Sequence, residues 1–360
     1  KIVKINFVRL QNFRNVEFAE ADLDSRSVWI CGQNAQGKTN LLEALGLLPA
    51  LRSFRTQNLK ALVRQSCKEA AILACVETCG SEYNEIEIRI SDRRSVRIDG
   101  SEIDKFSDYI GKFPALAMTS EDIRILRDSP DVRRKDVDMF ISSIDPQYFA
   151  ALKKYYAALP HRNALLKDGE QSSAIYEPFE LQMAEAAADI SQKRQKWLDE
   201  IGEIAGIRYA VLARENGEDA KIRLKSPYSG YSAEDFSKLF ERERNADLEA
   251  RLTRKGPHRD DMAFYVAGRD AKLYASEGQQ RSAVIALKLA QFEIQKRTTK
   301  TEPPILCDDI LGELDAYRRA AFWDCVSPTA QVIATSTIPA PADGIRSDWK
   351  TITVSNGKFQ

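Results

Sequence analysis

The segment Gly32-Gln-Asn-Ala-Gln-Gly37-Lys38-Thr39 has the residue types and the spacing of a phosphate-binding loop. Its glycines allow a tight turn whose backbone N–H groups point at phosphate oxygens, and a following helix adds partial positive charge. A lysine in the place of Lys38 reaches the β- and γ-phosphates, and the hydroxyl of Thr39 is a ligand for Mg²⁺. The sequence therefore predicts a site for ATP and Mg²⁺.

A pair of carboxylates follows a short apolar stretch late in the chain. Residues 304–307, Pro-Ile-Leu-Cys, read as a buried strand, and Asp308 and Asp309 come directly after it. With a phosphate loop present, we expect Asp308 to hold Mg²⁺, directly or through water, and Asp309 to act as a general base. Two such aspartates can also cap a loop, but the phosphate loop favours the catalytic reading. Lys38, Asp308 and Asp309 are the predicted catalytic residues.

A third cluster, Ser276-Glu-Gly-Gln-Gln-Arg281, stands at the start of an amphipathic helix. It precedes the Asp308 strand, in the order expected for an ABC-type ATPase head. There a Ser-x-Gly-Gln stretch contacts the γ-phosphate held by a second subunit, because small residues, a hydroxyl and the helix dipole favour an anion. Ser276, Gly278 and Gln279 are thus predicted to face the ATP of another copy, in a homodimer. The alternative is a helix cap with chance polar neighbours.

These three clusters must be positioned by the strands and helices that the sequence predicts around them. Alternating or short apolar runs predict strands at 2–10, 16–18, 28–30, across 70–99 with the clearest alternation at 85–90, and at 262–267, 305–307, 331–334 and 351–354. Asp99-Gly100 is a hairpin turn signal. Helical spacing marks residues 41–48, the region 148–166 and the region 179–204, and Pro160 and Pro178 are expected to interrupt the middle of the chain.

The predicted fold is α/β, an ABC- or SMC-like ATPase head with an inserted, mainly helical lobe. A strand-rich start and end enclose a helical middle without heptads, which argues against a coiled-coil arm. We place the N-terminal part of the ATPase lobe at 1–120, the helical lobe at 121–255 and the C-terminal part of the ATPase lobe at 256–360.

The composition limits the class of protein but does not indicate its binding partners. The 360 residues are 43% hydrophobic and 29% charged, with 53 basic and 53 acidic side chains, so net charge gives no argument for nucleic acid. No apolar run is long enough for a membrane span, and a reduced, cytoplasmic setting with buried thiols is expected. A metal site at Cys67, Cys75 and Cys79 is the less favoured alternative, since no Cys-x-x-Cys pair occurs.

Several longer stretches resemble the RecF family of bacterial recombination mediators. They are SEGQQR, KGPHRDD at 255–261, DDILGELD at 308–315 and SPDVRRKDVDMFI at 129–141, with LLEALGLLPALRSFRT and YYAALPHRNALLK in support. The resemblance covers nearly the whole chain and implies an ATPase head without the long coiled coil. It further implies ATP-dependent dimerisation, binding of duplex or gapped DNA, weak DNA-stimulated ATP hydrolysis, and cooperation with RecO and RecR in loading RecA during repair and replication-fork maintenance.

The resemblance also assigns roles to single residues. It places the phosphate contacts on Gly32, Asn34, Gly37, Lys38, Thr39 and Asn40, and it makes 313–315 a loop that communicates across the dimer. Thr335 or Thr337 lies where transporters place a switch histidine. Three positions depart from expectation: Ala35 replaces a frequent glycine, Glu121 is a stand-in for a metal-contacting glutamine, and Asp309 is shorter than the glutamate of transporters. The shorter base implies slow turnover.

Contacts to DNA are expected on basic side chains that touch phosphates without reading sequence. The predicted set is Arg133, Arg134, Lys153, Lys154, Arg162 and Lys255. Arg133 and Arg134 can equally brace the helical lobe, and His258 and Arg259 are expected to pack or to communicate across a dimer rather than to catalyse. A transporter ATPase subunit is the main rival, although such proteins carry a different signature, a shorter middle and a switch histidine. A long-armed SMC clamp and a metabolic kinase fit less well.

Overall fold

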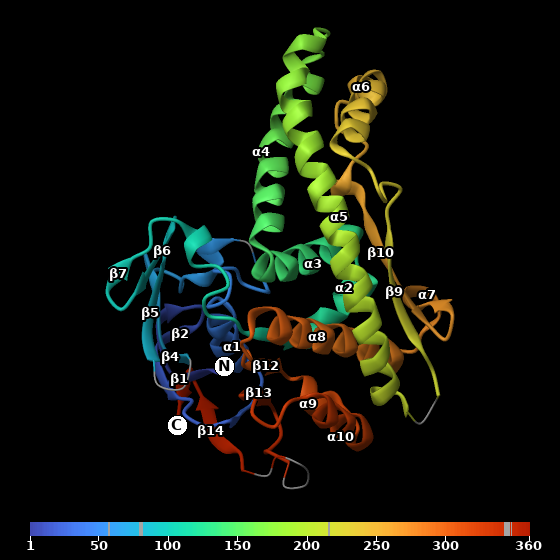
Figure 1. The fold of residues 1–360 in the computed structure, drawn as a ribbon. Coiled ribbons are helices and arrows are strands. Elements are labelled where there is room, and N and C mark those ends of the chain that lie inside the picture. Colours follow the sequence, from blue (N-terminus) through green and yellow to red (C-terminus); the bar gives the residue numbers. More distant parts are fainter. Residues whose placement is uncertain (57, 79–81, 215–216, 342–345, 347) are drawn as a thin grey trace. The chain divides into compact units, whose positions relative to one another are not determined.

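The computed structural model describes residues 1–360 except 57, 79–81, 215–216, 342–345 and 347. The chain forms two compact units, which are treated separately below. Unit 1 comprises Lys1–Asp122, Val211–Asn216 and Lys288–Gln360, and unit 2 comprises Ile123–Ala210 and Gly217–Leu287. Two helices labelled in Figure 1, α5 (Ser173–Leu212) and α8 (Glu277–Thr299), each contain residues of both units.

The first sheet of unit 1 is antiparallel, in the order β2-β1-β4-β5-β6-β7. Its strands are β1 (Val3–Phe13), β2 (Val16–Asp22), β4 (Ala70–Thr78), β5 (Glu82–Ile90), β6 (Arg94–Ile98) and β7 (Ser101–Glu102). The burial of β4 and β5 alternates along each strand, as expected for a sheet with one face on the core. Asp99 and Gly100 both have positive φ, 50° and 79°, between β6 and β7, which is the hairpin geometry that this dipeptide predicts.

The second sheet of unit 1 has a parallel centre, in the order β15-β14-β3-β13-β12-β8. Its strands are β3 (Ser27–Cys31), β8 (Leu116–Thr119), β12 (Ile305–Asp308), β13 (Val332–Ser336), β14 (Lys350–Ser355) and β15 (Lys358–Phe359). Every residue of β12 and β13 is buried, as is typical of parallel strands covered on both faces. The carboxyl ends of β3, β12 and β13 therefore meet at one edge, where ligands bind in open parallel sheets.

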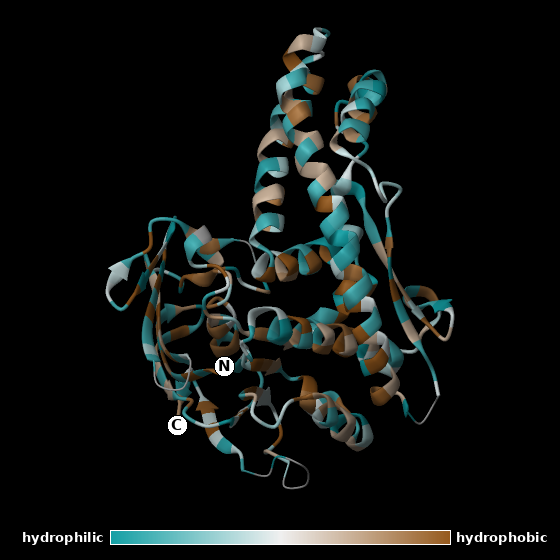
Figure 2. Cartoon of the chain, in the orientation of Figure 1, coloured by the Kyte–Doolittle hydropathy of each residue, from teal (hydrophilic) through white to brown (hydrophobic). Residues whose placement is uncertain are grey.

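Helix α1 (Lys38–Gly46) contacts strands of both sheets of unit 1. Leu41, Leu42 and Leu45 are almost fully buried in the same apolar cluster as Leu10 of β1 and Ile333 of β13. In Figure 2 the ribbon in the region of α1 carries brown, hydrophobic positions beside the strands of the sheets. The phosphate loop is consequently mounted on a helix that the core holds firmly.

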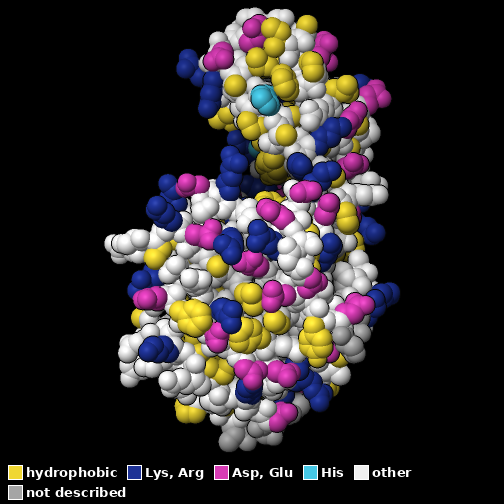
Figure 3. All heavy atoms as spheres, turned by 90° about the vertical axis from the view of Figure 1, so that its left-hand side faces the viewer, with side chains coloured by type: hydrophobic (Ala, Val, Ile, Leu, Met, Phe, Trp, Pro, Cys, Tyr) yellow, Lys and Arg dark blue, Asp and Glu magenta, His cyan; other side chains and the backbone are white. Residues whose placement is uncertain are grey.

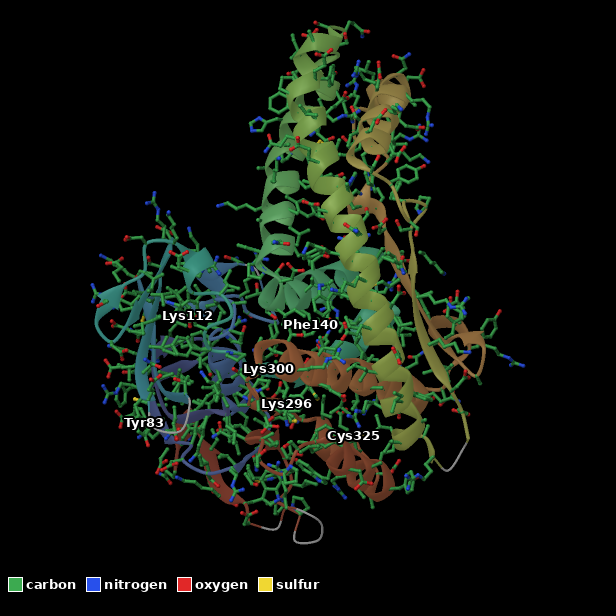
Figure 4. The ribbon with its side chains drawn as sticks, viewed as in Figure 1. Tyr83, Lys112, Phe140, Lys296, Lys300 and Cys325 are labelled. Carbon is green, nitrogen blue, oxygen red and sulfur yellow. The ribbon has the colours of Figure 1, made fainter. Side chains whose placement is uncertain are left out.

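Unit 1 also contains α-helices from the late part of the chain and several short 3-10 helices. They are α9 (Ile310–Glu313), α10 (Ala316–Cys325) and the C-terminal part of α8, with short 3-10 helices at Leu59–Leu62, Phe106–Asp108 and Ser120–Ile123. Lys296, labelled on α8 in Figure 4, pairs with Glu302 at 2.5 Å and so ties the end of α8 to the segment before β12. The strand β8 was missed by sequence analysis because it has only four residues and lacks a polar alternation.

Unit 2 consists mainly of helices with one small sheet. The helices are α2 (Arg124–Arg127), α3 (Pro130–Ile144), α4 (Pro146–Asp168), most of α5, α6 (Ala233–Ala250), α7 (Ala271–Tyr274) and the start of α8, with a 3-10 helix at Pro257–Arg259. The sheet has the order β11-β10-β9, with β9 (Ala220–Lys225), β10 (Asp261–Val266) and β11 (Arg269–Asp270). Phe140, labelled on α3 in Figure 4, is buried among these helices.

Two details of the predicted organisation differ from this arrangement. The expected interruptions at Pro160 and Pro178 are wrong, because α4 and α5 continue through them, each losing one backbone donor at its proline. The predicted border between the helical lobe and the C-terminal part of the ATPase lobe, at 255/256, also differs from the border between the compact units, at 287/288. The physical reason is that β10 pairs along its whole length with β9, which belongs to the lobe.

Two buried arginines hold unit 2 together. Arg162 of α4 is fully buried and bonds Glu180, Asp247 and Thr253 at 3.1, 2.8 and 2.8 Å. Arg194 of α5 is likewise fully buried and bonds four groups of other segments, which are the Asp138 carboxylate, the Asp260 carboxylate, the Tyr148 hydroxyl and the carbonyl of Pro257. Removing one partner of such a group would leave a buried charge uncompensated, at about 3–5 kcal/mol.

The GPHRDD motif, residues 256–261, lies at the centre of these contacts. Gly256 has φ +129°, and a Cβ there would come within 2.5 Å of the Tyr155 hydroxyl. Nδ1 of His258 is 2.7 Å from the same hydroxyl, and Nε2 is 3.0 Å from the carbonyl of Thr253. The motif therefore packs α4 against the segment that leads into β10.

The pH dependence of unfolding should report on His258. Burial, reinforced by nearby Arg259, Arg134 and Arg162, lowers the pKa of His258 to about 4, although its bond to Thr253 opposes the shift. The unfolded histidine titrates near 6.5, so the unfolded chain binds more protons between pH 6.5 and 4, and stability falls as the pH falls through this window. We expect urea unfolding to give a wild type that loses about 2 kcal/mol more than His258→Gln between pH 7.5 and 5. Equal losses in the two proteins would contradict the assignment.

Candidate functional site

The phosphate loop connects the end of β3 to the start of α1 in unit 1. Gly32 is required by close packing, since a Cβ there would lie 2.5 Å from the carbonyl oxygen of Val354 in β14. Gly37 caps α1 with φ +109°, a conformation that disfavours other residues. The loop thus ends at the N-terminus of a nine-residue helix, where backbone N–H groups are free for an anion.

Lys38 is folded over the loop that precedes it. Its Nζ donates to the carbonyl oxygens of Gly32 at 2.6 Å and Gln33 at 3.0 Å, and the side chain is only slightly exposed. The ammonium group therefore lies at the loop and within reach of a phosphate placed there. A pocket of about 500 Å³ opens beside it, lined by Arg14, Asn15, Asn34, Ala35, Gly37, Lys38, Thr39, Asn40, Arg55, Ala61, Val63 and Asp309.

Ala35 adopts the left-handed conformation, with φ 64°, at the exposed turn of this loop. An L-residue in that region costs about 1–2 kcal/mol, so Ala35→Gly relieves strain, while the added freedom of glycine in the unfolded chain offsets part of the gain. We expect Ala35→Gly to raise the free energy of unfolding by about 0.5–1 kcal/mol in urea titrations.

The control for this prediction is Ala320→Gly, on the exposed side of α10 in the same unit. Glycine weakens an ordinary helix, so this variant should lose up to about 1 kcal/mol. If both variants were destabilised by similar amounts, the strain assigned to Ala35 would be refuted.

Asp308, at the end of β12, lies between two threonine hydroxyls. Thr39 donates to its Oδ1 at 3.0 Å, and Thr335 of β13 donates to the same oxygen at 2.7 Å. Burial raises the pKa of the Asp308 carboxyl, an effect that the Thr335 bond opposes and the neighbouring Asp309 reinforces. A divalent cation would relieve this cost, and hydroxyl and carboxylate oxygens are the ligands that Mg²⁺ prefers, so Thr39 and Asp308 fit the ion.

Asp309 has φ 58°, which is left-handed for a residue with a side chain. Its backbone N–H donates to the Thr335 hydroxyl at 3.1 Å, and its side chain lines the pocket beside Lys38. Backbone strain of this kind is found where a side chain must be aimed at a ligand. Thr335 thus connects both aspartates, whereas Thr337 is exposed.

Sequence reasoning missed a second layer of side chains around the loop. Glu43 of α1 is fully buried and accepts from both Arg14, at 2.6 and 2.9 Å, and Arg55, at 3.1 Å. Both arginines line the pocket, and Arg55 also donates to Asn40 at 3.0 Å. The signal in the sequence was a glutamate on the buried face of an apolar helix, because a buried carboxylate requires a cation paired with it.

The remaining predicted positions of unit 1 are distributed along the same edge. Glu121 is exposed in the 3-10 helix that follows β8, the strand next to β12. Residues 313–315 join α9 to α10, and Asp315 caps α10 by accepting from the N–H of Arg318 at 2.7 Å. Among the described residues, no group of three or more His, Cys, Asp or Glu could hold a metal ion, and Cys79 lies outside those residues.

The signature segment, Ser276–Arg281, forms the start of α8 in unit 2. Ser276 and Gln279 make a reciprocal capping box: the Ser276 hydroxyl accepts from the N–H of Gln279 at 3.3 Å, and the Gln279 amide oxygen accepts from the N–H of Ser276 at 2.7 Å. Gln280 is buried and anchors the segment by accepting from Arg127 at 2.7 Å. Ser276 itself is exposed. The cap considered above is therefore present, on a serine that remains accessible.

The six residues predicted to contact DNA occupy different environments. Arg162 is enclosed by carboxylates, as described above, and its guanidinium cannot reach a DNA phosphate in this structure. Arg133 is buried and forms two bonds with Asp261, of 2.7 and 3.1 Å, so it braces the lobe. Arg134 bonds the carbonyl of Asp260 at 2.5 Å and is mostly covered.

The lysines of the predicted set remain on the surface. Lys153 and Lys255 are exposed, and Lys154 is paired with Glu185 in an exposed contact. Figure 3 shows Lys and Arg side chains interspersed with Asp and Glu on the face it displays. Charge clustering in the sequence does not indicate which of these basic residues are accessible.

Comparison with known proteins defines first the class and then the family. The family model of the RecF/RecN/SMC N-terminal domain matches residues 4–351. Solved SMC head domains share the fold, among them that of Pyrococcus furiosus, with a TM-score of 0.57 at 17% identity over 99% of this chain and 95% of that one. The chain therefore has the fold of the ATP-binding ATPase heads of the RecF and SMC type.

More similar relatives narrow this class. The DNA replication and repair protein RecF of Bacillus cereus (strain G9842) is 32% identical over 98% of this chain and 97% of that protein, and RecF of Bacillus mycoides (strain KBAB4) matches to the same extent. A solved structure of the recombination mediator RecF with ATP has a TM-score of 0.90 at 27% identity over 99% of this chain and 97% of that one. The chain belongs to the RecF family of DNA replication and repair proteins.

This family assignment agrees with the predicted α/β fold and with the resemblance found in the sequence. With this assignment, a transporter ATPase subunit is no longer the alternative explanation of the phosphate loop. The described part of the chain contains no helix long and apolar enough to cross a membrane.

Proposed function

We propose that this protein is an ATP-dependent, DNA-binding recombination mediator that dimerises when it binds ATP. In this proposal it binds duplex or gapped DNA, and with RecO and RecR it promotes the loading of RecA. The observation that supports it best is the junction of Thr39, Asp308 and Thr335 beside the Lys38 pocket, since it provides a place for a nucleotide and its metal.

The binding step uses groups already at the pocket. Lys38 exchanges its bonds to Gly32 and Gln33 for bonds to the β- and γ-phosphates, and the backbone of the loop, with Asn34 and Asn40, surrounds them. Mg²⁺ bound at Thr39 and Asp308 would neutralise part of the phosphate charge. Asp308 is then held ionised, against the effect of its burial.

The hydrolytic step falls to Asp309. Its carboxylate accepts a proton from water while the water oxygen attacks the γ-phosphorus, and the bond to the ADP oxygen breaks. Ser276, Gly278 and Gln279 of a second copy bind the γ-phosphate and so complete the site only in the dimer. Because the aspartate is short, we expect slow turnover and a long-lived ATP-bound dimer that hydrolysis resets.

The DNA contacts of this proposal rest on accessible cations. Lys153, Lys154 and Lys255 are the candidates, with Arg134 as a weaker one, and contacts of this type bind phosphates without reading sequence. ATP-dependent DNA binding is tested by anisotropy of a labelled duplex with a slowly hydrolysed ATP analogue, with ADP and without nucleotide. The proposal expects tight binding with the analogue alone and a linear fall of log affinity with log salt.

Each true phosphate contact contributes about 0.9 to that salt slope. Lys153→Ala and Lys255→Ala should each reduce the slope by about that amount, whereas Lys60→Ala, an exposed lysine of unit 1 outside the set, should leave it unchanged. DNA binding that is equally tight with and without nucleotide would refute the proposed function.

A further inference from the structure

The Gln279 side chain of the signature segment is held by a carboxylate from elsewhere in unit 2. Its Nε2 donates to both oxygens of Glu218, at 2.8 and 2.9 Å. Tyr209, buried on α5, donates to the same carboxylate at 3.2 Å. Since the amide oxygen of Gln279 already accepts from Ser276, every polar atom of this side chain is engaged within the molecule.

Glu218 is placed at Gln279 by close backbone packing. It comes two residues before β9, where Ala267 N–H donates to the carbonyl of Asp219 at 2.9 Å and extends the β9–β10 pairing. Two glycines of α5 let this strand approach: a Cβ at Gly202 would lie 2.9 Å from the Ile222 carbonyl oxygen, and one at Gly206 would lie 3.1 Å from that of Ala220. The position of the carboxylate is therefore built into the packing of α5 against the hairpin.

The negative charge of Glu218 affects anion binding because Glu218 is bonded to the start of α8. A helix N-terminus carries partial positive charge that favours an anion, and the start of α8 has the Glu218 carboxylate bonded to it through Gln279. The same serine, glycine and glutamine are the groups that receive a γ-phosphate in the proposed dimer. A phosphate brought to this helix start meets a like charge already bound there, and like charges at short range repel strongly where water is excluded.

We propose that Glu218 competes, within its own chain, with the ATP of a second copy for the signature segment. In the monomer it satisfies Gln279, and the release of Gln279 from Glu218 is one of the steps of ATP-dependent dimerisation. Glu218 is in this sense a regulatory residue that acts through Gln279, and the inference rests on the proposed function.

The test is the dimer dissociation constant with a slowly hydrolysed ATP analogue, measured by sedimentation for wild type, Glu218→Gln and Glu218→Ala. Removing the charge should tighten the dimer about 10-fold in both variants, equivalent to about 1.4 kcal/mol. The glutamine variant keeps the shape and an acceptor for Gln279, so it carries the test if the alanine variant folds poorly. Asp219→Asn is the matched control, because this exposed neighbour bonds Lys221 rather than the signature segment.

The sign of the change separates the proposal from a purely structural role. Weaker dimers in the Glu218 variants would mean that Glu218 only supports the signature segment, and unchanged dimers would mean that it does not act there; either result overturns the inference. Equal tightening of the dimer by Asp219→Asn would overturn it too, because the effect would then come from the net charge of the protein and not from the contact with Gln279. A wild type that stays monomeric with the analogue would instead refute the proposed function and this inference with it.

Discussion

Lys38→Met is expected to reduce ATP hydrolysis by about 100- to 1,000-fold and to weaken ATP binding by about 10-fold or more. The ammonium group of Lys38 already lies on the loop, bonded to Gly32 and Gln33, so it is positioned to follow charge as it develops on the phosphates. Methionine has a similar length but cannot donate. Phosphate release and the binding of a fluorescent ATP analogue measure the two losses.

The control for Lys38→Met is the same replacement at Lys60, whose side chain is 82% exposed in the same unit. Thermal unfolding should be nearly unchanged in both variants, since Gly32 and Gln33, whose carbonyls lose Lys38, are not fully buried and can bind water instead. If Lys38→Met hydrolysed ATP at a rate within 10-fold of the wild type, Lys38 would not be a catalytic residue.

Ser276→Arg is expected to abolish ATP-dependent dimerisation, weakening the dimer by at least about 100-fold, while the monomer still binds ATP. A large side chain at this exposed helix start prevents the close approach that the proposed contact requires. Sedimentation with a slowly hydrolysed ATP analogue measures the first effect, and equilibrium binding of the analogue to the monomer measures the second.

The capping role of Ser276 has to be separated from its role towards a partner. Asn and Asp both cap helices as well as serine does, so Ser276→Asn and Ser276→Asp should unfold at nearly the wild-type temperature. Only the aspartate places a negative charge against the partner's γ-phosphate, and it alone of the two should lose the dimer. Equal dimerisation of the two variants would show that residue 276 does not face a phosphate.

The phosphate loop and the strands beside it could be predicted from sequence because their signals are local. The turn at Asp99-Gly100 needs only two residues with positive φ, and β12 with Asp308 needs only an apolar run followed by a carboxylate. The strand β9 could not be predicted in this way. Its burial alternates only between intermediate and exposed, and it is stabilised by β10, a strand distant in sequence.

The sequence did not show which charged side chains are buried and which are accessible. Arg162 lies in a helix with exposed Lys153 and Lys154, and composition does not distinguish the three. What separates them is that Glu180 and Asp247 reach Arg162 from α5 and α6, which is a property of the tertiary packing. Arg14 and Arg55 were missed for the same reason, since Glu43 brings them together beside the pocket.

The central claim is that ATP joins two copies of this chain through the signature segment. Sedimentation of the wild type with the slowly hydrolysed ATP analogue, with ADP and with the analogue plus duplex DNA tests it most directly. The account predicts a dimer with the analogue, strengthened by DNA, and a monomer with ADP. A protein that stays monomeric while saturated with both the analogue and DNA would contradict it.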